Sequence, residues 1–482
     1  MSTLLASQSQ ILRISLGLTS AIALTMGVNT RTLAQTLISD PIDPAQLTTQ
    51  PTQNFVGITT HWQNPTGAIA TDLHYGLNAF QAFDPKVAGL NGNATYQNNL
   101  ATMRPGILRY HNMRSLRDST QDASGWVINP TTADYRWDRA KIALAMQGRR
   151  LSPKLMMNIP GWISYMTDAQ GRLKPEHYEQ FAEFCADLVR VVNIELKEDV
   201  KYWDVINEKD NAYPNDMAEL GRIYTLAARA MKQVDPTIKV GGPSFISPYD
   251  TLKVSAFLST AHADLDFVSY HTYSIGREAT PVSRIWQSAS TLGTATQAMR
   301  RALRAFPARS IELFHSEYNI SYTPPDARMT NMISAIYDAL AMASITSAGA
   351  TGAMAWNEAD GWYGKMNNHW GNWQKRPAAF VHQLYNRYML GNVVHSTSSN
   401  AASVTSYAVR NGNQYSLALI NRSEQDVWVQ NQFTGLNVPL GTVMTAFQVD
   451  TNGLTTTQVS LQTLQSGYRI PANTVHILTM NP

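Results

Sequence analysis

The feature of this sequence that most constrains its fold is a unit repeated over residues 74–391, in which a short apolar segment precedes a helical pattern. These segments are continuous apolar runs, which is typical of parallel strands buried on both faces. The pattern predicts an α/β fold of the (β/α)8 TIM-barrel type; an open, doubly wound sheet is the alternative. Eight such segments occur: Tyr75–Phe83, Gly106–His111, Lys154–Ile159, Lys201–Ile206, Ile238–Gly242, Leu265–Tyr270, Ser310–His315 and Thr351–Trp356.

The C-terminal residues 392–482 have a different pattern. Short segments that alternate apolar and polar residues, such as Val404–Arg410 and Tyr415–Asn421, are separated by Asn-Gly and Ser-Glu turns. This spacing predicts a C-terminal antiparallel β-sandwich domain. Residues 35–73 are expected to form a linker and one N-terminal strand, Asn54–Trp62, which lies outside the barrel and is free to join the sandwich.

The N-terminus predicts export. Arg13 precedes an apolar run from Ile14 to Val28, and small residues lead up to Ala34, so residues 1–34 are interpreted as a secretory signal peptide. The run is short for a membrane span, although Arg31 directly after it leaves a retained anchor as the alternative. We expect a secreted or periplasmic protein without an integral membrane span once the signal is removed. The lone Cys185 excludes an intrachain disulfide.

Composition narrows the choice of partner. A formal net charge of +3 over 482 residues, without a basic run, gives no support for a nucleic-acid ligand. Charged residues make up only 15% of the chain, and Asn, Gln, Ser and Thr take their place. This surface suits an extracytoplasmic protein, and the oligomeric state stays open.

Two of the predicted strands end in a carboxylate. Lys201–Ile206 runs into Asn207 and Glu208, and the seventh strand is followed by Glu317. Active sites of (β/α)8 barrels lie at the C-terminal ends of the strands. Two carboxyl groups that flank a glycosidic bond can cleave it, one as a proton donor with a raised pKa and the other as a nucleophile. We therefore expect the pKa of Glu208 to lie above that of Glu317.

Other readings of these residues exist. An Asn-Glu dipeptide arises easily by chance, and a glutamate at a strand end can be a structural ion-pair partner. Glu358 and Asp360, in the loop after the eighth strand, are rival carboxylates. His271 and His315 could form a metal site with Glu317, but without a recognised spacing. We expect no metal and no organic cofactor.

Polar and aromatic side chains at other strand ends fit a sugar-binding cleft. Arg109 would keep Glu317 ionised, or it forms a structural ion pair. In Tyr270–Tyr273 only alternate residues can point inward, which favours His271 and Tyr273 over Tyr270. Aromatic rings pack against sugar faces, so the candidates on the loops are Trp162, Trp356 and Trp362; packing of the loop on the barrel is the alternative, above all for Trp373.

The segments Tyr202–Glu208 and Leu313–Asn319 resemble the acid/base and nucleophile strands of the clan A retaining glycoside hydrolases. The resemblance is closest to the family 39 enzymes of the β-xylosidase and α-L-iduronidase kind, and it covers residues 75–390. It implies Glu208 as acid/base and Glu317 as nucleophile. The remaining roles that it implies are Asn207 at the sugar 2-hydroxyl, Arg109 beside the ionised nucleophile, Tyr270, His271 or Tyr273 as a donor to it, and Trp356 as the floor of the subsite.

The chain departs from the usual pattern at Lys209, where proline commonly follows Asn-Glu. The expectation is nevertheless an exported retaining glycoside hydrolase that cleaves O-glycosidic bonds of oligo- or polysaccharides with two glutamates. The alternative is a non-catalytic carbohydrate-binding barrel. The sugar, its linkage, exo or endo action and a glycan-binding role of the sandwich are not defined by the sequence.

Overall fold

The computed structural model describes residues 55–276, 279–306 and 309–481. The predicted signal peptide and most of the linker after it lie outside the described residues. Within the described ranges, no helix is long and apolar enough to cross a membrane.

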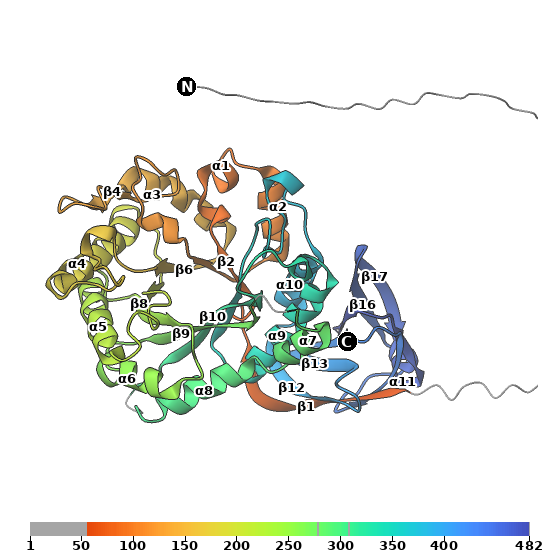
Figure 1. Cartoon of the computed structure of the whole chain (residues 1–482). Helices are drawn as coiled ribbons and strands as arrows, with labels where there is room; N and C mark the ends of the chain where they lie inside the picture. Colours follow the sequence, from red (N-terminus) through yellow and green to blue (C-terminus); the bar gives the residue numbers. More distant parts are fainter. Residues whose placement is uncertain (1–54, 277–278, 307–308, 482) are drawn as a thin grey trace, which may run out of the picture. The chain divides into compact units, whose positions relative to one another are not determined.

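The body of the protein is a closed barrel of eight parallel strands, seen near the centre of Figure 1. Each of the eight predicted segments overlaps one barrel strand, although several bounds differ, so the (β/α)8 prediction is confirmed and an open sheet is excluded. In barrel order they are β2 (Gly76–Ala79), β3 (Ile107–Tyr110), β6 (Lys154–Ile159), β7 (Tyr202–Val205), β8 (Lys239–Phe245), β9 (Phe267–Ile275), β10 (Glu312–Ser321) and β11 (Gly352–Ala355).

Amphipathic helices surround the barrel because one face of each is apolar. In α5, for example, Ile223, Ala227 and Met231 recur at helical spacing and are fully buried. Asparagine side chains cap α2 and α9, and a proline begins α10. The helices are α1 (Pro85–Ala88), α2 (Ala94–Met103), α3 (Arg139–Met146), α4 (Tyr178–Val189), α5 (Met217–Val234), α6 (Thr251–Ala261), α7 (Val282–Ala289), α8 (Gly293–Leu303), α9 (Met332–Ser347) and α10 (Pro377–Tyr388).

The C-terminal strands form one continuous sheet of nine strands, in the order β17-β16-β19-β14-β13-β12-β1-β15-β18. The earliest of these strands in the chain is β1 (Val56–Ala70), which pairs antiparallel with β12 and parallel with β15. A separate apolar core draws residues from both halves of this sheet, among them Trp62, Leu417 and Leu478. The other strands are β12 (Gly391–Ser398), β13 (Val404–Asn411), β14 (Gln414–Asn421), β15 (Val427–Thr434), β16 (Val443–Asp450), β17 (Gly453–Ser460), β18 (Tyr468–Ile470) and β19 (Thr474–Met480), with α11 (Leu461–Ser466) between β17 and β18.

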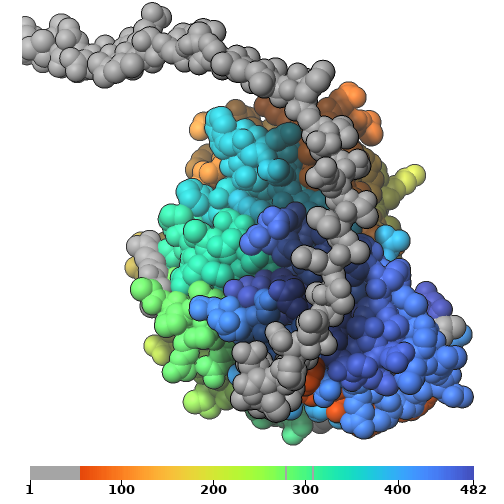
Figure 2. Space-filling model, turned by 90° about the vertical axis from the view of Figure 1, so that its right-hand side faces the viewer, coloured from red at the N-terminus to blue at the C-terminus, as the bar shows by residue number. Residues whose placement is uncertain are grey.

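Tyrosines join this sheet to the barrel. The Tyr75 hydroxyl, at the start of the first barrel strand, donates to the carbonyl oxygen of Met389 at 2.9 Å and lies 3.2 Å from the Tyr407 hydroxyl on β13. The ring of Tyr407 also stacks on Tyr385 of α10 at 6.2 Å. Figure 2 shows this face of the molecule, with the blue C-terminal sheet beside green and cyan segments of the barrel. The sheet therefore packs against the barrel at Tyr75 and along α9 and α10 (Figure 1).

Candidate active site

The interior of the barrel is filled in layers, because side chains of a strand alternate in direction. The lowest layer is apolar: Tyr202, Phe267 and Phe314 meet edge to face with ring centroids 5.2–5.9 Å apart. Two residues further along the same strands the layer is polar, with Asp204 on β7 and Ser269 on β9. The inward side chains two residues further along lie at the mouth of the barrel. An apolar plug thus supports a polar layer, and the candidate site lies on top of it.

Arg109 is the centre of the polar layer and is completely buried. Its Nε donates to Asp204 Oδ2 at 2.8 Å, and its Nη1 donates to Glu317 Oε1 at 2.8 Å. The remaining contacts go to Asn78 Oδ1 and Asn207 Oδ1, each at 2.8 Å, and to Ser244 Oγ at 3.0 Å. Burial alone would lower the pKa of Arg109, but the charges of Asp204 and Glu317 raise it. The guanidinium is a fixed cation that orients an amide and a carboxylate at the mouth.

Asp204 balances this buried charge. Besides Arg109, its carboxylate accepts hydrogen bonds from Ser269 Oγ at 2.7 Å, Ser244 Oγ at 2.9 Å and Asn158 Nδ2 at 3.1 Å. A buried charge is stable only when it is paired and its remaining lone pairs are satisfied. Five barrel strands, β3, β6, β7, β8 and β9, therefore contribute to one ionic cluster, which holds Arg109 in place.

The backbone after β7 is irregular where it delivers the first candidate carboxylate. Ile206 and Glu208 both have positive φ, at 75° and 55°. Such values are unusual for side chains with a Cβ and persist only where surrounding contacts enforce them. Here the Asn207 N–H donates to Pro160 O and the Glu208 N–H to Ser244 O, each at 3.2 Å. These contacts from neighbouring strands hold consecutive side chains, Asn207 and Glu208, at the barrel mouth.

Glu317 lies on β10 next to a shift in strand register. The pairing of β10 with β9 skips a residue between His315 and Glu317, as in a β-bulge, which re-aims the following side chain. Glu317 Oε1 accepts from Arg109, and Oε2 accepts from the Tyr273 hydroxyl at 2.8 Å. His111 Nε2 is 4.0 Å from Oε1. The Glu317 side chain is 6% exposed, so these donors rather than water stabilise its charge.

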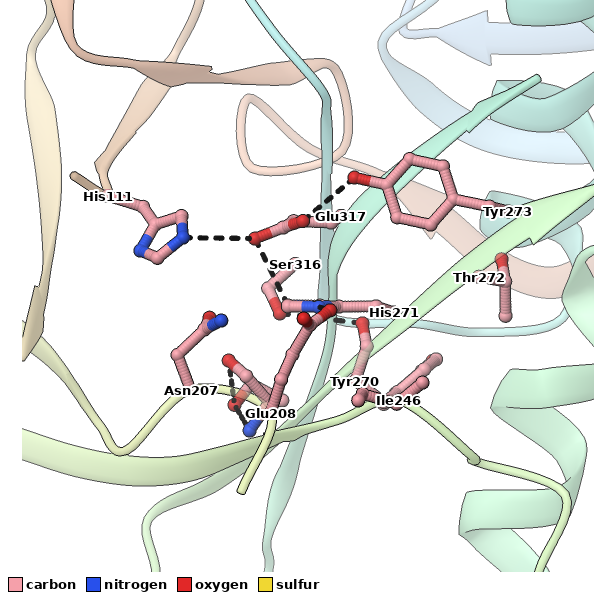
Figure 3. A network of polar contacts seen from close by, with 12 residues as sticks. His111, Asn207, Glu208, Ile246, Tyr270, His271, Thr272, Tyr273, Ser316 and Glu317 are labelled. Carbon is pink, nitrogen blue, oxygen red and sulfur yellow. Dashed lines mark hydrogen bonds and ion pairs between the residues drawn. The ribbon is translucent and has the colours of Figure 1, made fainter. Parts of the chain in front are cut away.

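His271 bridges the two glutamates (Figure 3). Its Nδ1 is 2.6 Å from Glu208 Oε1, and its Nε2 is 3.4 Å from Glu317 Oε1. One donor atom of each of the three side chains lies within 4.8 Å of the other two. Carboxyl groups about 5–5.5 Å apart are typical of retaining glycosidases, whereas inverting enzymes need ~6.5–9.5 Å to admit a water. The spacing fits direct attack by one of the glutamates.

The free structure gives Glu208 the opposite pKa shift from the raised value expected of a proton donor. Burial raises the pKa of Glu208, but the hydrogen bond and charge of His271, together with the charge of Arg109, lower it overall. A raised pKa of Glu208 is therefore not found, because the sequence could not show that His271 would contact Glu208, while the expected order of the two glutamates stays a prediction. The Glu208 side chain is also the more open of the pair, with 35% exposure.

Two of the aromatic candidates, Trp356 and Trp362, keep part of their surface exposed. Trp356 is partly exposed beside the site, with its ring centroid 5.5 Å from that of His111 and 6.3 Å from that of Phe80. Trp362 is 50% exposed on the loop after β11.

Tyr270 is fully buried and donates to Thr296 Oγ1, whereas Tyr273 reaches Glu317. The inward positions in this segment are therefore those that strand alternation favours.

Trp162 corrects the sequence interpretation. Its side chain is 6% exposed, its Nε1 donates to Gly171 O at 3.2 Å, and its ring packs edge to face against Phe181 and Tyr213. A ring enclosed in this way has no free face for a sugar. We therefore assign Trp162 to the packing of the loop after β6. The sequence alone did not define which side of the loop the ring would face.

The rival carboxylates shape the loop after β11. Glu358 Oε1 accepts from the backbone N–H groups of Phe80 and Gln81 at 3.0 and 2.6 Å, and burial raises the pKa of Glu358 to about 8. Asp360 Oδ1 accepts from the backbone N–H groups of Trp362, Tyr363 and Gly364. Both side chains hold loop backbone in place and do not join the Glu208–Glu317 pair.

The structure changes the ligand set of the metal-site alternative, because Glu208 takes the place of His315. Within the described part of the chain, the group of potential ligands found is Glu208, His271 and Glu317. His315 is not among them: its Nε2 lies 2.6 Å from Thr272 Oγ1, and burial lowers its pKa to about 3. The three remaining donors already interact with one another and with Arg109 and Tyr273.

Six residues of the cluster were not identified from the sequence: Asn78, His111, Asn158, Asp204, Ser244 and Ser269. Asp204 carried a usable signal, because a charged residue inside an apolar strand requires a buried partner. Asn78 and Ser244 carried none, since only the closed barrel brings them to Arg109. His111 lies two residues after Arg109 on the same inward face, and alternation from Arg109 could have located it.

Comparisons with known proteins agree with this geometry. Residues 163–355 match the model of glycosyl hydrolases family 39, and this segment contains both Glu208 and Glu317. A β-xylosidase of Caldicellulosiruptor saccharolyticus is 27% identical over 161 residues, which are 32% of this chain and 32% of that protein. The match thus spans about a third of the length of this curated relative.

Solved structures match over most of the chain. A monomeric β-xylosidase from Caulobacter crescentus has a TM-score of 0.64 at 15% identity, covering 88% of this chain and 99% of that one. A GH39 enzyme from Xanthomonas axonopodis pv. citri has a TM-score of 0.66 at 16% identity, covering 89% and 98%. At such identities these two structures establish the shared fold. Together with the family model, they confirm the resemblance to clan A hydrolases of the family 39 type.

Proposed function

We propose that this protein is a retaining glycoside hydrolase that uses Glu317 as nucleophile and Glu208 as acid/base. The observation that carries the proposal is the spacing of the two glutamates, which each place one carboxylate oxygen within 4.8 Å of the other at the C-terminal ends of barrel strands. The family 39 match over both residues supports the same reaction class.

In the first step, a Glu317 carboxylate oxygen attacks the anomeric carbon, and the bond from this carbon to the leaving oxygen breaks. The leaving oxygen takes the proton of Glu208 and departs as a hydroxyl. Arg109 and the Tyr273 hydroxyl donate hydrogen bonds to the Glu317 carboxylate and orient it for attack. Asn207, whose amide oxygen is fixed by Arg109, is oriented beside the acid for a sugar hydroxyl.

In the second step, water attacks the anomeric carbon of the glycosyl-enzyme. Glu208, now ionised, removes a proton from this water, and the bond to Glu317 breaks with return of its carboxylate. The lowered pKa of Glu208 in the free site favours its ionised form, which a base must have before it accepts a proton. For the first step, a substrate that displaces His271 from Glu208 would restore its proton affinity.

The two roles are distinguished by leaving groups. Glu317→Gln abolishes attack on every substrate. Glu208→Gln slows release of a poor leaving group far more than release of 2,4-dinitrophenolate, which needs no proton. Initial rates on a panel of nitrophenyl and alkyl glycosides test this difference. Equal losses for good and poor leaving groups in Glu208→Gln would overturn its role as acid, and bound glycan without turnover in the unaltered protein would favour the non-catalytic carbohydrate-binding alternative.

We also propose that residues 1–34 direct export and are then removed. The apolar run and the small residues before Gln35 support this. Mass spectrometry of the protein from the culture medium or periplasm of an expressing host should give a mature N-terminus at or near Gln35. Retention of residues 1–34 in the membrane fraction would instead indicate an anchor.

A further inference from the structure

A large cavity adjoins the candidate active site. It has a volume of about 970 Å³, and it meets the site at His111 and Trp356. From there it extends over the loop after β2, the loop after β3 and the start of the barrel's outer layer at α3. Clefts of ~300–1,000 Å³ commonly enclose drug-sized ligands, so this volume exceeds the need of one sugar ring.

The position of the cavity defines which part of a substrate it can hold. The leaving group must lie against the proton donor. The lining includes neither glutamate nor His271, and it meets the site through His111 and Trp356. His111, which does line it, is 4.0 Å from Glu317 Oε1. The cavity therefore lies on the side of the nucleophile, where the glycone continues away from the bond that is cleaved.

The walls of the cavity offer apolar surface for sugar rings. Tyr110 and Trp126 stack at 4.5 Å and support one wall from below. Met113 and Leu144, which are 49% and 48% exposed, also contribute to the lining. An enzyme that removes single terminal sugars needs a closed wall beyond the reacting ring, whereas here the cavity continues past Trp356.

The charges of the lining are unbalanced. The four cations are Lys86, Arg114, Arg117 and Lys141, and the two anions are Asp84 and Asp122. Arg117 pairs with Asp122 at 3.5 Å, and the Lys141 ammonium donates to the carbonyl oxygens of Ser119 and Asp122.

Lys86 and Arg114 differ from these two cations. Both are exposed, and the ion pairs found among the described residues do not include either of them. Asp84, beside Lys86, is engaged as the cap of α1. The charge of Arg114 does help to lower the pKa of Asp122, but neither cation is held in an ion pair. Two such cations in a sugar-sized cleft are suited to a carboxylate or sulfate of the ligand.

We propose that this cavity binds at least two further sugar units on the glycone side, one of them acidic, so that the substrate is an acidic polysaccharide cleaved within its chain. This inference rests on the proposed function for the direction of the glycone. It adds to it a substrate class and a mode of action.

Binding to a turnover-deficient protein tests the inference independently of catalysis. In Glu317→Gln, titration calorimetry should give tighter binding of glucuronoxylan oligosaccharides than of the same oligosaccharides after carboxyl reduction, with the preference declining as salt is raised. Dextran sulfate against dextran distinguishes sulfate from carboxylate as the acidic group. Equal affinity for acidic and neutral members of both pairs would overturn the inference.

Charge removal locates the site. Lys86→Ala/Arg114→Ala should weaken binding of the preferred acidic glycan about tenfold and leave the neutral counterpart unchanged. The matched control Lys197→Ala/Arg301→Ala removes two exposed cations outside the cavity lining and should change neither. Equal weakening by both double variants would reduce the effect to net charge and contradict the proposed site.

Product length tests the mode of action. Oligosaccharides of two or more units should appear first from the preferred polysaccharide, while aryl monoglycosides, which fill only the reacting subsite, are cleaved equally by the parent and by Lys86→Ala/Arg114→Ala. Release of single sugars from the outset would contradict the extended glycone site and leave the two-glutamate reaction intact. Loss of all hydrolysis, with acidic-glycan binding retained, would instead contradict the proposed function alone.

Discussion

Among the described residues, two buried ionic clusters can be compared, one at the mouth of the barrel and one sealed between helices. In the first, Arg109 pairs with Asp204 and with Glu317 at 2.8 Å, and Glu317 faces the mouth of the barrel. In the second, Lys365 pairs with Asp338 at 2.8 Å, and His382 Nε2 lies 3.2 Å from the same carboxylate. The second is enclosed between α9, α10 and the loop after β11, with all three side chains inaccessible.

Similar chemistry therefore serves two purposes. The charge of Lys365 and the hydrogen bond of His382 outweigh burial and lower the pKa of Asp338, which keeps the sealed pair ionised. Lys365 also ties its loop to Asn357 through a backbone hydrogen bond of 3.0 Å, next to Trp356. The sealed cluster holds a loop, whereas the open cluster presents a carboxylate at the mouth of the barrel. Substitutions in the first should cost activity, and those in the second should cost stability.

The largest effect is expected for Glu317→Gln. Loss of the nucleophile should reduce kcat/KM by at least ~10³-fold. The free energy of unfolding should change by less than ~1.5 kcal/mol, because Arg109 retains Asp204 as its buried partner. Initial rates and urea titrations measure the two quantities. A large loss of stability with little loss of rate would invert the distinction between the clusters.

Lys365→Met should have the second largest effect, on stability. Removal of one partner of a buried pair typically costs about 3–5 kcal/mol, because the Asp338 charge remains buried. The double variant Asp338→Leu/Lys365→Met should recover much of this loss. As a control, Arg229→Met breaks an exposed pair with Asp264 and should change the urea midpoint far less. Failure of the double variant to recover any stability would argue that packing, not charge, dominates this site.

Tyr273→Phe tests a single contact within the open cluster. It removes the donor to Glu317 Oε2, and hydrogen bonds to charged groups contribute roughly 1.5–3 kcal/mol, so kcat/KM should fall about 10–100-fold. The urea midpoint should stay close to that of the parent. Unchanged kcat/KM on the best aryl glycoside would exclude this hydroxyl from the stabilisation of Glu317.

His271→Gln should give the smallest change, a shift of the pH profile. Glu208 must be protonated to donate, so its deprotonation defines the basic limb of kcat/KM. The hydrogen bond and charge of His271 lower the pKa of Glu208, and without them this pKa rises. The basic limb should therefore move to higher pH. His476→Gln, which removes a buried imidazole from the C-terminal sheet, should leave the limb in place; a shift to lower pH in His271→Gln would contradict the account.

Much of this arrangement could be predicted from the sequence. Continuous apolar runs identified all eight barrel strands, and their ends located Arg109, Glu208 and Glu317 before any contact was known. Strand alternation separated His271 and Tyr273 from Tyr270. These features depend on local pattern and on the rule that places active sites at one end of such barrels.

The remainder depends on contacts between distant segments. The positive φ of Ile206 and Glu208 and the register shift in β10 arise from neighbouring strands and have no local signature. The pKa of Glu208 is lowered by His271, 63 residues away in the chain. Trp162 was misassigned because the sequence does not define which face of a loop an aromatic ring will occupy.

The stereochemistry of the first product tests the central claim most directly. Hydrolysis of a reactive aryl glycoside should be followed by proton NMR in the first minutes, before the sugar mutarotates. Two glutamates with oxygens within 4.8 Å predict that the anomer released first has the configuration of the substrate. Initial appearance of the opposite anomer would contradict a nucleophilic role for Glu317.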